Sequence, residues 1–426
     1  MDERIGAITL KRRVGHRLGP GLITGACNDD PSSVGTYSQI GAQYGYALAW
    51  TLLFSYPLVV AIQEISARIG RVTGHGIAGN LQRHYPGWLA GGLVALLALA
   101  NVFNLAADLG AMGAVLRLLL KAPALLYVCV LALALVLFEL FTHHARYVWV
   151  LKWLCLSLLS YVICAFVVDV PWGQVAHALI WPALSASPHY IVAVVAALGT
   201  TISPYLFFWQ AQQEVEDGRH RSGAAPLLQD PSEARPEFAR IRLDTVLGMG
   251  LSSTVALFIV ITSASTLHAH GATTIQTAAE AAEALRAVGG RFTFVVFALG
   301  IIGAGLLTLP ALSASAAYAV GELLSWRVGR VYRPGRARAF YAAIAAAIGV
   351  ACLLNFTRIN PMRALYWSAV LNGVIAVPLM IALMHLSTRE AVMGPLRLPG
   401  GLSALGWLAT LTMAASVAAM ALTWLL

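Results

Sequence analysis

The sequence predicts an all-α membrane protein with about eleven transmembrane helices. Of its 426 residues, 59% are hydrophobic and only 11% are charged, against roughly 25% charged residues in an ordinary soluble domain. Long apolar runs recur from one end of the chain to the other, and each is close to the ~20 residues that cross a bilayer as a helix. No change of composition marks a soluble domain, so residues 1–426 are expected to form one transmembrane domain in a lipid bilayer.

Nine of the apolar runs have the composition of ordinary transmembrane helices. They lie near residues 46–69, 88–117, 124–142, 147–168, 243–267, 292–325, 339–356, 364–386 and 402–425. Two further spans, near residues 18–44 and 189–213, place proline and small polar residues at mid-membrane depth. Numbered in chain order, these are the first and the sixth of the eleven spans. The longest polar stretch, about residues 214–242, is expected to be a charged loop.

The distribution of Lys and Arg predicts the orientation in the membrane. With the N-terminus in the cytoplasm, 22 of the 28 Lys and Arg residues fall on the inner side and six on the outer side, as the positive-inside rule requires. The basic N-terminal segment lacks the apolar region and cleavage site of a signal peptide. We therefore expect a multi-pass protein of the cell membrane with an extracellular C-terminus. The net charge of +9 then needs no nucleic-acid partner.

All five cysteines fall inside expected spans, and none has the spacing of a metal cage or of a disulfide framework. They are Cys27, Cys129, Cys155, Cys164 and Cys352. We expect them to pack as small hydrophobic residues, and we expect no cofactor.

The first and sixth spans contain the most unusual sequences of the chain. The first reads GACNDDPSSVGTY and sets Asp29 and Asp30 beside Pro31, although a carboxylate at the bilayer centre costs about 3 kcal/mol. The sixth reads LGTTISPYLFFWQ around Pro204. A proline can merely kink a helix, but two broken helices in corresponding positions are typical of a transporter site. Asp30 is favoured as the site residue because proline follows it directly, whereas Asp29 either points elsewhere or shares that role.

The two prolines also predict an inverted repeat. Pro31 and Pro204 are five spans apart, in segments that cross the membrane in opposite directions. Corresponding breaks of this kind relate two halves of a transporter by a two-fold axis in the membrane plane. We therefore expect a first repeat at 18–170, a second repeat at 189–386 and an extra helix at 402–425.

The breaks predict a cation site built from oxygen atoms. The inner half of the first span ends near the backbone carbonyl of Cys27, and the outer half of the sixth ends near Thr200, so two negative helix ends converge. The Asp30 carboxylate and the hydroxyls of Ser33, Thr200 and Ser203 complete the expected ligand set. Oxygen ligands suit a hard cation.

Other polar residues are expected to support this site. Asn101, Asn104 and Asp108 fall on one face of the third span, which should face the bundle interior, although the asparagines are equally well explained as interhelical hydrogen bonds. Asn372 is a lone polar residue of the tenth span. Two stripes could line access paths: Ser32, Thr36, Gln39 and Gln43 on the outer side, and Gln210, Gln213, Glu214 and Asp217 on the inner side. For the inner stripe, a solvated helix end is the favoured interpretation.

The segments GPGLITGACNDDPSS and LGTTISPYLFFWQ resemble the Nramp family of divalent metal transporters, and the resemblance covers essentially the whole chain. It implies a LeuT-like fold with a 5+5 inverted repeat and discontinuous helices 1 and 6. The family motif of the first span is Asp-Pro-Gly-Asn; here Asp30 and Pro31 match, and Ser32 and Ser33 replace the other two residues.

The sixth span departs further from its family motif, Gly-Ala-x-x-Met-Pro-His. Ser203 stands for the methionine and Tyr205 for the histidine. In the family the methionine sulfur favours transition metals over hard ions. With Ser203 in its place, the sixth span resembles that of the Nramp-related magnesium transporter branch. This resemblance implies transport of Mg²⁺, with Mn²⁺ also carried, as partly hydrated ions.

Proton coupling is not expected. Family members that move protons share the histidine and an acidic pair in the third span, where Asp108 matches the first acid and Ala111 replaces the second. Tyrosine does not titrate near neutral pH. Two charges moved through 100 mV release about 4.6 kcal/mol, at about 2.3 kcal/mol per charge, so the membrane potential alone can drive uptake by alternating access.

Three other functions compete with this interpretation. A proton-coupled Mn²⁺/Fe²⁺ importer of the ordinary Nramp type is the main alternative. A cation-coupled amino-acid symporter would present backbone N–H groups at its break, and Asp30 would repel the substrate carboxylate. A membrane enzyme is disfavoured because no HExxH or GxSxG motif occurs in the spans. The protein is expected to work as a monomer.

Overall fold

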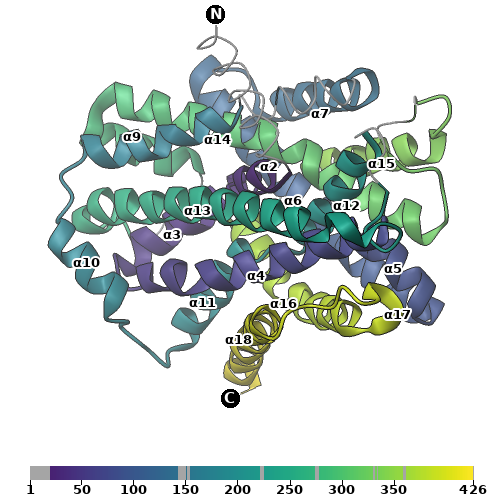
Figure 1. Ribbon diagram of the computed structural model, residues 1–426. Helices are drawn as coiled ribbons and strands as arrows, with labels where there is room; N and C mark the ends of the chain where they lie inside the picture. Colours follow the sequence, from purple (N-terminus) through teal and green to yellow (C-terminus); the bar gives the residue numbers. More distant parts are fainter. Residues whose placement is uncertain are drawn as a thin grey trace, which may run out of the picture.

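The computed structural model describes residues 20–142, 150, 154–220, 225–273, 278–329, 332, 334–357 and 361–425. These residues form a bundle of helices, and no strand occurs among them (Figure 1). The helices are α2 (Pro20–Ala26), α3 (Pro31–Tyr44), α4 (Ala49–Thr73), α5 (Ile77–His84), α6 (Gly87–Leu120), α7 (Ala124–Phe141), α9 (Leu159–Val167), α10 (Trp172–Ile180), α11 (Pro188–Thr201), α12 (Pro204–His220), α13 (Ala234–Thr266), α14 (Ala278–Leu323), α15 (Arg338–Leu354), α16 (Pro361–Thr388), α17 (Glu390–Met393) and α18 (Gly400–Leu425). Eight helical segments within the described ranges are long and apolar enough to cross a membrane, and α15 is a shorter apolar helix.

Most of the expected spans correspond to these helices. The second, third, fourth and seventh to eleventh expected spans coincide with α4, α6, α7, α13, α14, α15, α16 and α18. The fifth, 147–168, is described at residue 150 and from residue 154, where a 3₁₀ turn (Cys155–Leu158) leads into α9. The rest of that span lies outside the described residues.

The expected charged loop at residues 214–242 is wrong at both ends. α12 continues to His220, and α13 begins at Ala234. The helices extend into this polar stretch because its charges pair with one another. Arg240 of α13 bonds to Glu214 of α12 and to Glu237 of its own helix, and the three side chains are shielded from solvent.

Both expected helix breaks are confirmed. Residues 27–30 separate α2 from α3, and residues 202–203 separate α11 from α12. Each second half begins with a proline, whose fixed φ suits the first turn of a helix and whose missing N–H would have no partner there. At the first break Asp30 is the N-cap of α3, in extended backbone conformation.

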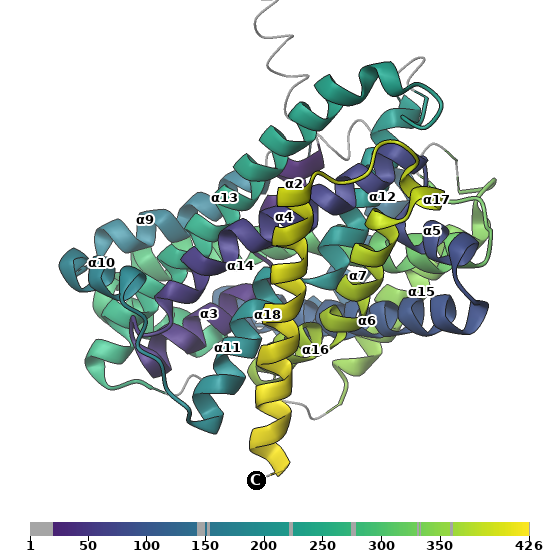
Figure 2. The same ribbon diagram turned by 60° about the horizontal axis from the view of Figure 1, so that its bottom comes forward.

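Helices from distant parts of the chain pack together around the breaks. α13 lies along α2, α3 and α4, while α12 packs on α4 (Figure 1). α6 packs on α14 and α16. α18 packs on the outside of the bundle beside α4, α11 and α16, and it lies in front of the other helices in Figure 2. The first break therefore lies deep in the protein, and every residue from 23 to 38 is buried.

The sequence did not predict a close approach between two cysteines. The sulfurs of Cys129 on α7 and Cys352 on α15 lie 4.0 Å apart, and both thiols are free. The two residues are far apart in the chain, so only the packing of α7 on α15 brings them together.

Candidate functional site

The Asp30 carboxylate is buried at the first break and is surrounded by donors from its own helix. Its Oδ1 atom accepts hydrogen bonds from the Ser33 amide at 2.6 Å, the Ser33 hydroxyl at 2.7 Å and the Ser32 hydroxyl at 2.7 Å. The side chain thus caps α3, whose N-terminal dipole stabilises a negative charge. The two serines, which replace Gly and Asn of the family motif, supply both hydroxyls.

The second break is closed by Ser203. Its hydroxyl donates to the carbonyls of Gly199 at 3.0 Å and Thr200 at 2.8 Å, which are left open at the end of α11. The Thr200 hydroxyl is buried and has no hydrogen-bond partner within the described part of the chain. No hydrogen bond in that part joins Ser203 or Thr200 directly to Asp30.

Tyr205 connects the two breaks. Its hydroxyl donates to the Cys27 carbonyl at 2.6 Å and lies 3.3 Å from Oδ2 of Asp30. A second link joins the Tyr37 hydroxyl of α3 to the Thr201 hydroxyl of α11 at 2.9 Å. The sequence predicts Tyr205 at the family's histidine position but not as a ligand, and in the structure it contacts two of the expected ligands. The available signal was its position one residue after Pro204, in the first turn of α12.

The neighbouring carboxylates point toward different helices. Oδ1 of Asp29 accepts a hydrogen bond from the Ser252 hydroxyl of α13 at 3.1 Å, and the same hydroxyl accepts one from the Asn28 side-chain Nδ2 at 2.8 Å. Oδ2 of Asp29 has no partner among the described residues. Ser252 was not identified from the sequence, because nothing local to α13 indicates that it faces the first break.

The polar stripe of α6 faces the bundle interior as expected, since all three side chains are buried. Oδ1 of Asp108 accepts a hydrogen bond from the Ser32 amide at 2.9 Å. Asn104 donates to Asn372 of α16 at 3.0 Å, and Asn101 donates to the Leu312 carbonyl of α14 at 3.2 Å. The asparagines therefore join helices, whereas Asp108 contacts the break itself.

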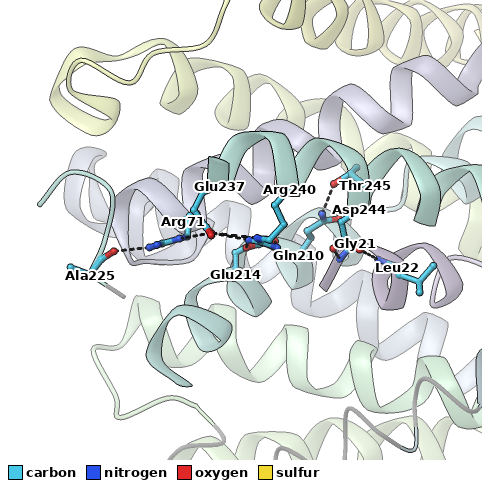
Figure 3. A network of polar contacts seen from close by, with 10 residues as sticks. All are labelled: Gly21, Leu22, Arg71, Gln210, Glu214, Ala225, Glu237, Arg240, Asp244 and Thr245. Atoms are coloured by element: carbon cyan, nitrogen blue, oxygen red, sulfur yellow. Dashed lines mark hydrogen bonds and ion pairs between the residues drawn. The ribbon is translucent and has the colours of Figure 1, made fainter. Parts of the chain in front are cut away.

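The interpretation of the inner stripe as a solvated helix end is wrong for Gln210 and Glu214. Gln210 and Glu214 are buried, at 0% and 1% exposure. Gln210 donates to the Thr245 hydroxyl at 2.9 Å, and Glu214 pairs with Arg240 at 2.5 Å (Figure 3). A counter-ion on α13 makes burial of this carboxylate possible. The outer stripe, by contrast, runs from buried Ser32 and Thr36 to exposed Gln43.

The three acids near the breaks have no basic partner among the residues that the structure describes. No ion pair in the described part of the chain involves Asp29, Asp30 or Asp108, and all three are at most 2% exposed. No group of three His, Cys, Asp or Glu side chains there is arranged to hold a metal ion. A cation at the breaks would therefore be held by one or two carboxylates together with hydroxyl and carbonyl oxygens, a set that suits a hard ion.

Comparison with known proteins bears on this site. A family model described as natural resistance-associated macrophage protein-like, or Nramp, matches residues 21–423. The chain belongs to the Nramp family. Two similar relatives are divalent metal cation transporters named MntH. The one from Pectobacterium carotovorum subsp. carotovorum (strain PC1) is 25% identical over 384 residues, which cover 88% of this chain and 86% of the relative. The one from Burkholderia ambifaria is 27% identical over 403 residues, which cover 90% and 85%.

Solved structures confirm the fold of this Nramp protein. The manganese transporter of Eremococcus coleocola, in complex with an aromatic bis-isothiourea compound, superposes with a TM-score of 0.72 at 19% identity, covering 95% of this chain and 86% of the other. The nucleobase-cation-symport-1 transporter Mhp1 gives a TM-score of 0.58 at 15% identity, covering 96% and 93%. The expected fold class, an all-α membrane protein of LeuT-like architecture with discontinuous helices 1 and 6, is thus confirmed, and the chain is a multi-pass membrane transporter.

Proposed function

We propose that this Nramp protein carries divalent metal cations, Mg²⁺ and Mn²⁺ foremost, by alternating access through a site at the two helix breaks. Asp30, Ser33, Thr200, Ser203 and the Cys27 carbonyl are its proposed ligands. The observation that carries the proposal is the buried Asp30 carboxylate, which has only oxygen and nitrogen donors around it and no basic partner in the described residues. The similar MntH relatives, named divalent metal cation transporters, support the cargo class.

The donor set favours hard ions over soft ones. Ser203 offers a hydroxyl where the family motif has a methionine sulfur. The Cys27 sulfur points away, since it donates to the Leu307 carbonyl of α14 at 3.6 Å. Because Mg²⁺ keeps several waters when bound, the short side chains at 32, 33 and 203 are suited to a partly hydrated ion.

Transport is proposed to be driven by the membrane potential without a proton. Tyr205 occupies the histidine position, and a tyrosine keeps its proton at neutral pH. Its hydroxyl donates to the Cys27 carbonyl, so the side chain acts as a hydrogen-bond donor and not as a proton carrier. Asp108, whose Oδ2 atom has no partner in the described part of the chain, is the residue that would carry a proton in the rival proton-coupled Mn²⁺/Fe²⁺ importer.

An amino-acid symporter is the less favoured alternative. Its substrate carboxylate would need open N–H groups at the start of α3. In this protein the Ser32 amide donates to Asp108, the Ser33 amide to the Asp30 side chain and the Val34 amide to the Asp30 carbonyl. The first turn of α3 is therefore already bonded, and its donors face acids of the protein.

The expected placement in the cell membrane completes the proposal. The protein works as a monomer, the N-terminus and the charged ends of α4 and α13 face the cytoplasm, and the C-terminus faces outward. The repeats at 18–170 and 189–386 exchange access between the two sides, with the helix at 402–425 outside them.

Reconstituted vesicles test the proposal. Uptake of Mg²⁺, Mn²⁺ and Ca²⁺ is measured under a set potential, with a pH-sensitive dye inside. Asp30→Ala should abolish uptake of every ion, whereas Asp169→Ala, at an exposed aspartate after α9, should not change it. Ser203→Met should shift preference from Mg²⁺ toward Mn²⁺. Normal uptake by Asp30→Ala would refute the site, and acidification of the lumen with metal uptake would favour the proton-coupled alternative.

A further inference from the structure

Asp244 of α13 caps a helix to which it is not adjacent in sequence. Its Oδ2 atom accepts a hydrogen bond from the Gly21 amide at 2.6 Å, and its Oδ1 atom accepts one from the Leu22 amide at 3.1 Å (Figure 3). These are first-turn amides of α2, which have no partner within their own helix. Asp244 is fully buried, so the two charge-assisted bonds form away from water, where they are strongest.

Below this cap, α2 and α13 touch backbone to backbone. A Cβ atom added at Gly25 would lie 2.1 Å from the Gly248 carbonyl oxygen, and one added at Gly248 would lie 2.2 Å from the Gly21 carbonyl oxygen. Gly21 and Gly25 are four residues apart, the spacing at which small residues let two membrane helices approach closely. No side chain separates the two helices at this point.

The same face of α13 continues to the first break. Ser252 follows Asp244 and Gly248 at the spacing of one helical face, and its hydroxyl bonds to Asn28 and Asp29. α13 thus holds α2 at its first amides, along its middle and beyond its last turn. The position of the Cys27 carbonyl, at the end of α2, depends on these contacts.

The inner half of the other broken helix is held by the same stretch of α13. Gln210 bonds to Thr245, and Glu214 pairs with Arg240 (Figure 3). Farther along, Glu237 pairs with Arg71 of α4 at 3.0 Å. We call the ion pairs of Arg240 with Glu214 and Glu237, and of Glu237 with Arg71, the charged network, and the side of the molecule that carries it the network face. Cys27, Gln210 and Glu214 are each at most 1% exposed, so we interpret this packing as an arrangement that is closed on the network face.

The two half-helices differ in how readily they can leave α13. α12 is tied to it by an ion pair and is 17 residues long. α2 has only seven residues, and the non-helical segment 27–30 connects it to α3. α2 can therefore pivot about that segment once its cap is released, whereas α13 packs against several helices along its 33 residues.

We propose that Asp244 is a positioning residue that latches α2 shut, and that its release from the Gly21 and Leu22 amides opens the path between the ion site and the network face. The inference rests on the proposed alternating-access function and names the contact that alternates. Cys27 is a built-in reporter, because its sulfur is fully buried next to the break in the latched state.

Cysteine labelling tests the latch without any metal. The full-length protein, with its other four cysteines replaced by alanine, is reconstituted and exposed to a membrane-impermeant maleimide from one face at a time. Asp244→Asn keeps the shape of the side chain but loses its charge and one acceptor. We expect Cys27 labelling from the network face to become about ten-fold faster, with no change from the opposite face. Asp230→Asn, which alters an exposed cap of the 3₁₀ turn Pro231–Glu233, should label like the parent.

Two further measurements keep the test decisive. Leu22→Pro deletes one donor of the latch in the first turn, where proline is tolerated, and should accelerate labelling from the same face. In transport, Asp244→Asn should weaken the apparent Mn²⁺ affinity from the opposite face and strengthen it from the network face, as a shift in the populations of two states requires. Equal acceleration from both faces, or unchanged labelling of folded Asp244→Asn, would overturn the latch. Absence of metal flux in the parent would instead count against the proposed function, while the labelling result would still stand.

Discussion

Replacing Tyr205 with phenylalanine is expected to tighten Mn²⁺ binding while making the metal-free protein less stable. In the structure the Tyr205 hydroxyl bonds to the Cys27 carbonyl at 2.6 Å and lies 3.3 Å from Oδ2 of Asp30. We expect an ion that binds this carbonyl to displace the hydroxyl, because both would lie against the same oxygen atom. A neutral hydrogen bond of this kind contributes about 1–1.5 kcal/mol net, and 1.4 kcal/mol is about a ten-fold change in affinity. Tyr205→Phe should therefore bind Mn²⁺ up to about ten-fold more tightly.

The stability of protein prepared without metal should move in the opposite direction. Without the hydroxyl, the buried Cys27 carbonyl has lost its donor, which costs about 1–3 kcal/mol. Calorimetric titration of purified protein with Mn²⁺ gives the affinity, and thermal unfolding with and without Mn²⁺ gives the stability. Tyr341→Phe is the control, since that hydroxyl on α15 also donates to a backbone carbonyl, of Tyr332 at 3.2 Å. Weaker Mn²⁺ binding by Tyr205→Phe would refute the reasoning, because it would show that the hydroxyl stabilises the Mn²⁺-bound protein.

Two further predictions concern packing and pH. Gly25→Ala should lower the yield of folded protein and its melting temperature, because the added methyl group meets the α13 backbone. Gly91→Ala on α6 is the control and should be neutral or slightly stabilising, because its methyl group meets nothing within 4 Å. Equal melting temperatures of the two variants would contradict the close contact between α2 and α13. Burial and two neighbouring arginines lower the pKa of His75, between α4 and α5, to about 4. Since this pKa lies below the value of about 6.5 of an unfolded histidine, the unfolded chain binds the proton more readily, and stability present above about pH 6.5 is lost as the pH falls toward 4. The melting temperature of His75→Gln should therefore fall less than that of the parent between pH 7 and 4.5. Parallel curves of melting temperature against pH for the two proteins would contradict the lowered pKa of His75.

The membrane-spanning architecture was predictable because its causes are local. Length and apolarity alone place α4, α6 and α7 within a few residues of their observed bounds, since a helix in lipid must satisfy its own backbone. The breaks were predictable for a related reason. Pro31 and Pro204 cannot continue a helix in the ordinary way, and a carboxylate such as Asp30 is tolerated at mid-membrane depth only inside a bundle.

The error at the charged stretch has an equally physical cause. A polar helical face looks the same in sequence whether it faces water or a counter-ion on another helix. Glu214 was therefore assigned to a solvated end, although Arg240 buries it. The two residues are 26 positions apart, and no helical period relates side chains of separate helices.

The amino-acid sequence alone predicts that this chain resides in the bilayer, which segments cross it as helices and where two of those helices break. Hydrophobic length, proline and buried charge are local properties of each segment, so they can be read without knowing how the helices pack. Only the tertiary structure decided which groups meet at the breaks. Tyr205 reaches the Cys27 carbonyl across 178 positions of sequence, and Asp244 reaches the Gly21 amide across 223. Such partners are selected by how α12 and α13 pack on α2, and a hydrogen bond forms only where that packing brings a donor within about 3 Å of an acceptor.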